Sequence, residues 1–269
     1  MSEAINTKSV TDSVRKRLQA WFERPLGQYL LEREQAVLDR ILPNLFGYHL
    51  MQIGLLYRDN FLNSSCISHR ILVQLDEEGE LQQGADMQCA QDYIPLAADS
   101  VDVVVLPHVL EYSANPHRLL REIERILIGE GHLIIIGFNP WSFCGVWRAL
   151  LAWRDEPPWS GHFFSYGRLR DWFSLLDFEQ VHIERFFYLP PFRNMKLIRK
   201  LDFIEKIGSY CCPFVGGVNV IVVKKRVIPL TPVKLIWHKK RSMIESGLAE
   251  PTARTSGNIR HRNIELTTE

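Results

Sequence analysis

The apolar residues along this chain follow two different spacings. Runs in which nearly every residue is apolar predict buried β-strands, and apolar residues recurring every three or four positions predict helices. The predicted strands cover residues 48–54, 70–75, 101–106, 132–138, 178–189 and 214–225. The predicted helices cover 26–42, 115–127, 141–153, 166–176 and 195–207, with another before Pro25. Strands that alternate with helices indicate an α/β protein.

The clearest succession of elements lies between residues 101 and 138. Its first strand is almost continuously β-branched and ends at Pro107. Asn115 can cap the next helix and Pro116 can occupy its first turn. Glycines at 129 and 131 then break the chain before the next strand. The expected product is a strand–helix–strand unit with a parallel crossover. Five charged side chains of the helix are expected to face water: Arg118, Arg121, Glu122, Glu124 and Arg125.

We divide the chain into three parts. Residues 1–43 form N-terminal helices that pack on the core, and residues 44–226 form the α/β domain. Within that domain, residues 140–166 are a strongly aromatic segment, expected to be a lid or to contact a substrate. Residues 227–269 are basic and then polar, so we expect a flexible tail.

Composition narrows the class of protein. The chain has 46% hydrophobic residues, enough for a packed core, and its 32 basic and 31 acidic side chains nearly cancel. The field of the whole molecule therefore favours neither a nucleic-acid nor a membrane partner. Five cysteines without CxxC spacing indicate reduced thiols, and no apolar run is long enough for a signal peptide or a membrane span. We expect a cytoplasmic protein that binds no metal, because Cys211 and Cys212 lack partners at useful spacing.

Residues 100–140, SVDVVVLPHVLEYSANPHRLLREIERILIGEGHLIIIGFNP, resemble the type 11 branch of the class I S-adenosylmethionine-dependent methyltransferases. The family's fourth strand, an H-x-L-E segment, a helix of the form L-R-E-h-x-R-h-L, a glycine turn and the fifth strand occur in order. The segments 25–35, 46–54 and 137–142 look like a bacterial subgroup of that branch. The resemblance implies a Rossmann-like fold, with a mostly parallel seven-stranded sheet flanked by helices, and S-adenosylmethionine as cofactor.

The glycine turn after the first strand departs from the family pattern acid-x-Gly-x-Gly-x-Gly. Gln52 stands at the acid, Gly54 keeps the first glycine, and Leu56 and Arg58 replace the others. The resemblance places Gln52 and Gly54 at the cofactor. A leucine where the backbone should approach the ligand would push the cofactor away, unless the turn follows another path.

The family's two acidic contacts are also altered. Asp76 follows Gly54 by 22 residues, where the ribose-binding carboxylate is expected, although a solvated turn residue fits equally well. Ala90 occupies the adenine-contacting position, and Asp92 is the candidate substitute. Only residues 77–84 separate Asp76 from Ala85, which is too short for the usual crossover helix. The adenine side of the pocket should therefore be open.

Methyl transfer is an in-line displacement that depends mainly on alignment. The resemblance places Pro107 and His108 near the reacting methyl group, so His108 is the candidate catalytic or contact residue. The alternative is a histidine that packs at a strand end. Glu111 is expected to tether its helix rather than act as a base.

The acceptor is expected beyond the fifth strand. Asn139, Trp141 and Ser142 follow that strand directly, and Tyr166, with residues 162–164, can close the same pocket. The alternative is an aromatic segment packed on the core.

Three functions remain open. The first is a methyltransferase acting on a small or medium, partly apolar molecule. The second is a catalytically inactive methyltransferase-like protein that binds or regulates a partner. The third, nucleic-acid modification steered by the basic residues 224–241, is disfavoured because that segment has the composition of a solvated tail. The oligomeric state is not predicted.

Overall fold

The structure is a computed structural model that describes residues 16–54, 59–75, 81, 84–151, 158–188, 208, 210 and 213–227. The chain divides into two units, residues 1–228 and 229–269. The second unit, with nearly all of the predicted tail, lies outside the described residues. So do the predicted helix 195–207, Asp76 and the turn residues Leu56 and Arg58.

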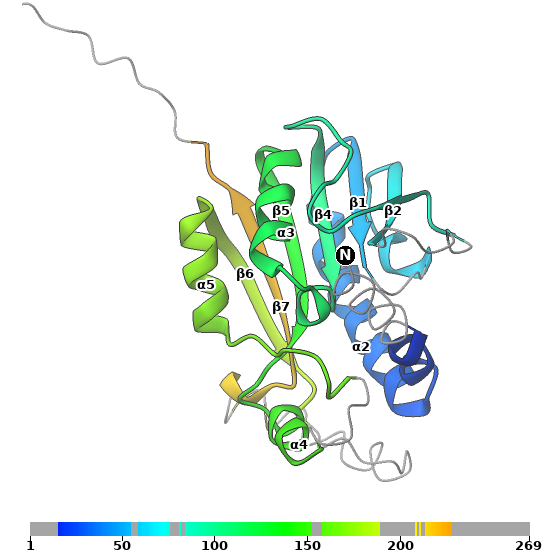
Figure 1. The fold of residues 1–269 in the computed structure, drawn as a ribbon, viewed down its shortest axis with the longest axis vertical. Coiled ribbons are helices and arrows are strands. Elements are labelled where there is room, and N and C mark those ends of the chain that lie inside the picture. Colours follow the sequence, from blue (N-terminus) through cyan, green and yellow to red (C-terminus); the bar gives the residue numbers. More distant parts are fainter. Residues whose placement is uncertain are drawn as a thin grey trace, which may run out of the picture. The chain divides into compact units, whose positions relative to one another are not determined.

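Within the described residues, the first unit contains one seven-stranded sheet in the order β3-β2-β1-β4-β5-β7-β6 (Figure 1). The first five strands are parallel, whereas β7 runs antiparallel to both β5 and β6. The predicted Rossmann-like α/β class is confirmed. The strands are β1 (His49–Ile53), β2 (His69–Leu75), β3 (Met87–Cys89), β4 (Val101–Pro107), β5 (Leu127–Phe138), β6 (Phe178–Phe186) and β7 (Val218–Lys225).

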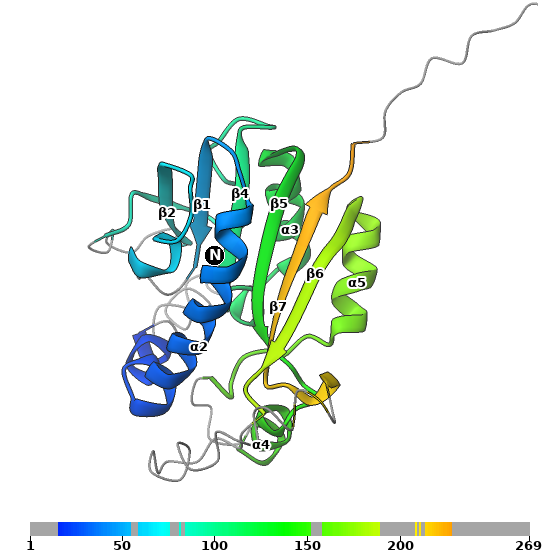
Figure 2. The ribbon, with the colours of Figure 1, turned by 180° about the vertical axis from the view of Figure 1, so that it is seen from behind.

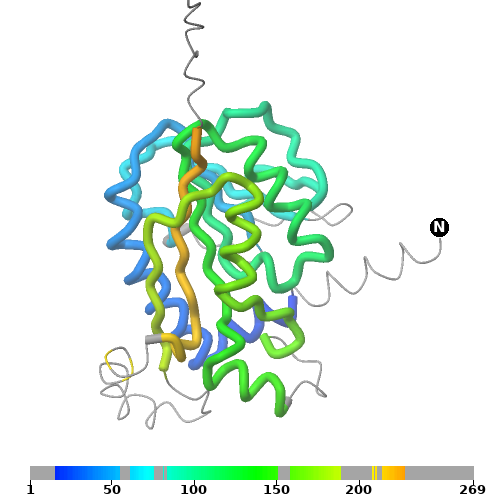
Figure 3. The backbone as a smooth tube through the Cα atoms, turned by 90° about the vertical axis from the view of Figure 1, so that its left-hand side faces the viewer, coloured from blue at the N-terminus to red at the C-terminus, as the bar shows by residue number. Residues whose placement is uncertain are grey.

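Helices cover both faces of the sheet. Helix α2 (Pro25–Ile41) lies on one face, and α3 (Pro116–Ile126) and α5 (Tyr166–Leu175) lie on the other (Figures 2 and 3). Helix α4 (Phe143–Leu151) follows β5 and lies beyond the end of the sheet. Residues 16–22 are also helical. Short 3-10 turns are η1 (Leu42–Asn44), η2 (Asp59–Leu62), η3 (Leu110–Tyr112) and η5 (Pro213–Val215).

Strand β4 lies at the centre of two hydrophobic cores. All seven of its residues are buried. Because side chains alternate across a strand, Val103 and Val105 face the α2 side, whereas Val104 and Leu106 face α3. This explains why the strand has an almost unbroken run of apolar residues.

Proline residues set the starts of two helices. The predicted interruption at Pro25 is confirmed, since Arg24 is extended and α2 begins at the proline. Helix α3 begins at Pro116 as predicted, but the Asn115 side chain makes no capping hydrogen bond. The backbone carbonyl oxygen of Asn115 instead accepts hydrogen bonds from the amides of Arg118 and Leu119.

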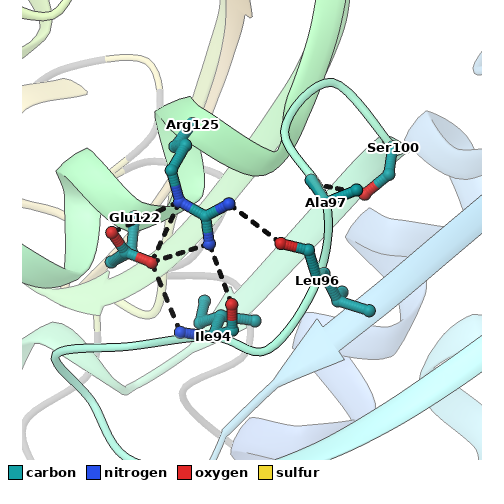
Figure 4. A network of polar contacts seen from close by, with 6 residues as sticks. All are labelled: Ile94, Leu96, Ala97, Ser100, Glu122 and Arg125. Atoms are coloured by element: carbon teal, nitrogen blue, oxygen red, sulfur yellow. Dashed lines mark hydrogen bonds and ion pairs between the residues drawn. The ribbon is translucent and has the colours of Figure 1, made fainter.

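Two local predictions need correction. Strand β5 begins at Leu127, because the glycine segment 129–131 forms an irregularity in the pairing with β4 and not a break. Arg125 and Glu122 are part-buried and do not simply face water. Arg125 donates to the Leu96 and Ile94 carbonyl oxygens at 2.9 and 2.8 Å (Figure 4). It also pairs with Glu122 at 2.9 Å, so α3 holds the loop before β4.

The described residues of the first two crossovers contain little helix. In the connection from β1 to β2, the described residues 59–68 contain only the turn η2, whose Phe61 and Leu62 pack in the same core as α2. In the connection from β2 to β3, residues 76–86, the described positions contain no helix. Helix α2 and the turn η2 therefore cover the same face of the sheet, the one on which α2 lies.

Candidate functional site

The carboxyl ends of β1 and β4 mark the point where the strand order reverses. Strand β1 pairs with β2 on one side and β4 on the other, and β4 continues to β5. Ligands of open α/β sheets bind in the crevice at such a point. Gly54 and His108 are the first residues beyond the two strands, and Gly54 is in close contact with Pro107. A Cβ atom on Gly54 would lie 3.1 Å from the Pro107 Cγ.

The His108 side chain points into the protein. It is fully buried, and its backbone has a φ of 52°, in the left-handed region. Its Nε2 lies 2.8 Å from the Glu34 Oε1, and its Nδ1 lies 3.2 Å from the Glu111 Oε1. The Phe138 ring stands 4.4 Å from the imidazole, centroid to centroid. Both ring nitrogens are therefore used within the protein.

Opposing effects act on the charge of His108. Burial lowers its pKa, but the charges of Glu34 and Glu111 and their hydrogen bonds raise it more, to about 10. The imidazole is therefore protonated at neutral pH and forms a buried ion cluster with Glu34 and Glu111, which we call the Glu34–His108–Glu111 cluster. Among the described residues, the second oxygen of each carboxylate is buried and makes no hydrogen bond.

Glu111 also joins two elements. Its Oε1 accepts a hydrogen bond of 2.8 Å from the Phe138 amide at the end of β5. A Cβ atom at Gly137 would stand 3.0 Å from the same oxygen, so the carboxylate lies directly against the β5 backbone. Glu111 thus links η3 to the end of β5.

The other predicted cofactor residues are spread along the edge. Gln52 is buried within β1, beside Leu72 and Val105 of the neighbouring strands. Asp92 follows β3, and its carboxylate pairs with Arg118 of α3 at 2.7 Å. The structure therefore brings Gly54, Pro107 and His108 together at the reversal point, while the Asp92 carboxylate is already paired with α3.

Two of the residues that were predicted to contact the methyl acceptor, Asn139 and Ser142, form hydrogen bonds that hold the backbone beyond β5. The buried Asn139 donates to the carbonyl oxygens of Phe214 and Gly216 at 2.8 and 2.9 Å. Ser142 is also buried, donates to the Asn139 carbonyl at 2.6 Å and accepts from the Gly145 amide in the first turn of α4. These bonds fix the turn that carries Trp141.

Trp141 is placed differently. Its side chain is 75% exposed and borders a hollow of about 420 Å³, within the size range of ligand pockets. Tyr166 does not line this hollow, and its hydroxyl donates to Gln180 of β6. We call the space the aromatic hollow; its lining residues are Pro140, Trp141, His162, Phe163, Phe164, Ser165 and Arg168.

Sequence reasoning missed Glu34 and Arg168. Glu34 carries a signal that could have been noticed, because it lies on the apolar face of α2 with Leu30 and Leu38. A charged residue at such a position needs a buried partner. Arg168 carries no comparable signal in the sequence.

The described residues also bear on metal binding and on membrane spans. No group of three His, Cys, Asp or Glu side chains there is arranged to hold a metal ion. None of the helices in the same part of the chain is both long and apolar enough to cross a membrane.

Comparison with known proteins shows to which family the chain is related. Residues 66–135 match the family model described as a methyltransferase domain. The "Uncharacterized protein YafS" of Escherichia coli (strain K12) is 34% identical over 225 residues, which cover 82% of this chain and 87% of that protein.

Solved structures share the fold at low identity. A SAM-dependent methyltransferase from Thermotoga maritima matches with a TM-score of 0.59 at 16% identity, over 82% of this chain and 100% of that one. A chain from a complex between the Haloferax volcanii Trm112 methyltransferase activator and a methyltransferase matches with a TM-score of 0.54 at 18% identity, over 80% and 98%. Together with the matched methyltransferase domain and the YafS relationship, these findings show that the chain belongs to the type 11 branch of the class I methyltransferases, in the same family as YafS.

Proposed function

We propose that this protein transfers a methyl group from S-adenosylmethionine to a small or medium acceptor with an apolar or aromatic body. The observation that carries the proposal is the aromatic hollow, which begins directly after β5. Its wall is connected to the strand-reversal point, because the His162 amide donates to the Glu111 carbonyl at 2.8 Å. A ligand in the hollow would therefore lie beside the segment that follows β4.

The reversal point offers a suitable place for the cofactor. Gly54 has no side chain, so the β1 backbone can lie directly against Pro107 at the end of β4, which keeps the two strand ends close together at this point. Pro107 and the His108 backbone form the facing edge, and Gln52, Asp76 and Asp92 remain candidates for further contacts. S-adenosylmethionine would supply an electrophilic methyl group here, and the protein would align the acceptor with it and exclude water.

His108 acts in this proposal as a positioning residue. With a pKa of about 10 it already holds a proton at neutral pH, so it cannot take one from an acceptor. Its hydrogen bonds instead fix the segment from 108 to 111 against α2 and β5. This arrangement suits a reaction that depends mainly on alignment.

The cysteines support a reducing compartment. Among the described residues, Cys66, Cys89 and Cys144 are free thiols. Burial raises the pKa of the Cys89 thiol to about 11, which keeps it protonated. We therefore propose a cytoplasmic location, while the proposal of a small-molecule substrate rests on the aromatic hollow.

Isothermal titration with S-adenosylmethionine and S-adenosylhomocysteine tests the cofactor site. We expect both to bind the full chain, and binding to weaken strongly in Gly54→Val, whose Cβ would press on Pro107. Gly167→Ala is the matched control, because a Cβ there has nothing within 4 Å. Absence of binding at millimolar ligand in the wild type would refute the proposal.

A second candidate function rests on how two predicted cofactor residues are used. His108 is paired with Glu34 and Asp92 with Arg118, which suits a methyltransferase-like protein that binds or regulates a partner without catalysis. Formation of S-adenosylhomocysteine in the presence of any acceptor would eliminate this candidate. Cofactor binding without turnover across a broad acceptor panel would favour it.

A further inference from the structure

We infer that the aromatic hollow binds aromatic carboxylates, with Arg168 holding the carboxylate and the surrounding rings holding the planar body. Identifying such a ligand as the methyl acceptor rests on the proposed function. Binding itself does not, since every contact in the inference comes from the hollow.

The walls of the hollow provide fixed aromatic surface. Phe163 is stacked on Phe138 with ring centroids 5.0 Å apart, and the Arg148 guanidinium lies 5.1 Å from the Phe163 ring. Trp141 faces the same space with most of its indole exposed to solvent. Phe163 is buried and therefore fixed, whereas the exposed Trp141 is of the kind typical of binding sites, because it offers much contact area at little cost in side-chain entropy.

Arg168 gives the hollow its charge. Its guanidinium lies 5.9 Å from the Phe164 ring centroid and 5.6 Å from that of Trp172, within the range of cation–π contacts. These contacts orient the group, and no described residue accepts a hydrogen bond from its guanidinium donors. Among the described residues no carboxylate pairs with it, in contrast to Arg118, which pairs with Asp92, and Arg226, which pairs with Glu179.

The remaining lining is electrostatically one-sided. Of the lining residues that the structure describes, none is acidic, and the only other titratable side chain is that of His162. Ser165 accepts a hydrogen bond from the Arg168 amide and begins α5, so the positive end of that helix adds to the field. A cationic ligand is therefore disfavoured, although aromatic walls alone could hold one.

The charge also argues for a carboxylate. A guanidinium binds a carboxylate through two parallel hydrogen bonds, and one positive charge balances one negative charge. A phosphate dianion carries two negative charges, which Arg168, the one permanent cation among the described lining residues, would not balance.

The experiment measures binding of matched pairs to the full chain without cofactor. Phenylacetate and phenylacetamide form one pair, and indole-3-acetate and indole-3-acetamide the other, each titrated by calorimetry. Hydrogen bonds to charged groups predict that each carboxylate binds roughly tenfold more tightly than its amide. The preference should disappear in Arg168→Gln and persist in Arg170→Gln, which alters an exposed arginine on the same helix.

Three results would overturn the inference: equal affinities within both pairs, no carboxylate binding at millimolar concentration, or a carboxylate preference that survives in Arg168→Gln. Arg168→Lys keeps the charge but not the paired donors and should bind with intermediate affinity. Thermal unfolding of the two glutamine variants shows whether both are folded.

The outcome is separable from that of the proposed function. If the carboxylates bind selectively while S-adenosylmethionine does not bind, the hollow is a receptor and the proposed methyl transfer fails. If the cofactor binds but the pairs show no preference, only the present inference fails.

Discussion

Glu34 and His108 are 74 positions apart in the chain, yet the Glu34 Oε1 and the His108 Nε2 are 2.8 Å apart and both side chains are fully buried. The contact joins α2 to the carboxyl end of β4. An isolated charge at this depth would be strongly unfavourable, whereas a paired one is tolerated. The ion pair therefore holds α2 against the carboxyl end of β4, where the candidate site lies.

Removing Glu34 should destabilise the protein strongly. In Glu34→Ala the buried imidazolium keeps only Glu111, and losing one partner of a buried ion pair costs about 3–5 kcal/mol. The free energy of unfolding in urea measures the effect. Glu32→Ala is the control, because Glu32 is exposed on the same helix and its loss should change stability by no more than about 0.5 kcal/mol. Equal stability of the two variants would contradict the role of the buried pair.

The same cluster predicts a pH dependence of stability. The pKa of His108 is raised from 6.5 to about 10 by folding, so the folded protein holds this proton more tightly than the unfolded chain. The resulting stabilisation is complete below pH 6.5 and is lost as the pH rises toward 10, by at most about 1.4 kcal/mol per pH unit.

Denaturant unfolding between pH 6.5 and 10 measures this loss. His108→Asn is the comparison, since asparagine tolerates the left-handed backbone of this position. Its stability should fall less steeply over the same range. Parallel profiles for the two proteins would show that His108 does not titrate as stated.

Most strands could be predicted because buried strands need nearly continuous apolar residues. Val101 to Leu106 satisfies this on both faces, and the structure assigns Val101–Pro107. Strand β3 could not be found in this way, because its three residues are too few to show a period. The irregularity around Gly129–Gly131 depends on pairing with β4, which no local pattern contains.

The site was predictable only in part. The H-x-L-E segment predicted that His108 and Glu111 follow the fourth strand directly, where the structure has them. The direction of the His108 side chain could not be predicted, because it depends on Glu34 in a helix far away in the sequence. Arg168 reaches the hollow beside Trp141 only through the packing of α5 on the sheet.

Arg125 should be needed to hold the loop before β4. Its guanidinium bonds two carbonyl oxygens, those of Ile94 and Leu96, and pairs with Glu122. Arg125→Leu leaves these acceptors without their donor and should cost about 1–3 kcal/mol.

Hydrogen exchange provides the local measurement for that variant. The amides of Tyr93, Ile94, Leu96 and Ala97 should exchange faster in Arg125→Leu than in the wild type. Arg121→Leu alters an exposed arginine of the same helix and should leave them unchanged. Unchanged exchange in Arg125→Leu would mean that the loop is held by other contacts.

Two glycines beside the aromatic hollow differ in the space around them, so substituting each by alanine should have opposite effects on stability. A Cβ atom on Gly145 would lie 1.9 Å from the Pro140 carbonyl oxygen, so Gly145→Ala must shift α4 or the turn that carries Trp141. Such overpacking should cost about 1–3 kcal/mol and weaken phenylacetate binding. A Cβ atom on Gly167 meets nothing within 4 Å, and Gly167 lies in α5.

Gly167→Ala should therefore stabilise the protein by about 0.5–1 kcal/mol, since alanine loses less backbone freedom in a helix than glycine does. Unfolding in urea and calorimetric titration with phenylacetate measure both variants. If Gly145→Ala has the same free energy of unfolding and the same affinity for phenylacetate as the wild type, α4 is not packed on the Pro140 turn. Trp141 is then not held at the hollow by that contact. Because Gly167→Ala leaves the lining unchanged, its affinity for phenylacetate should equal that of the wild type.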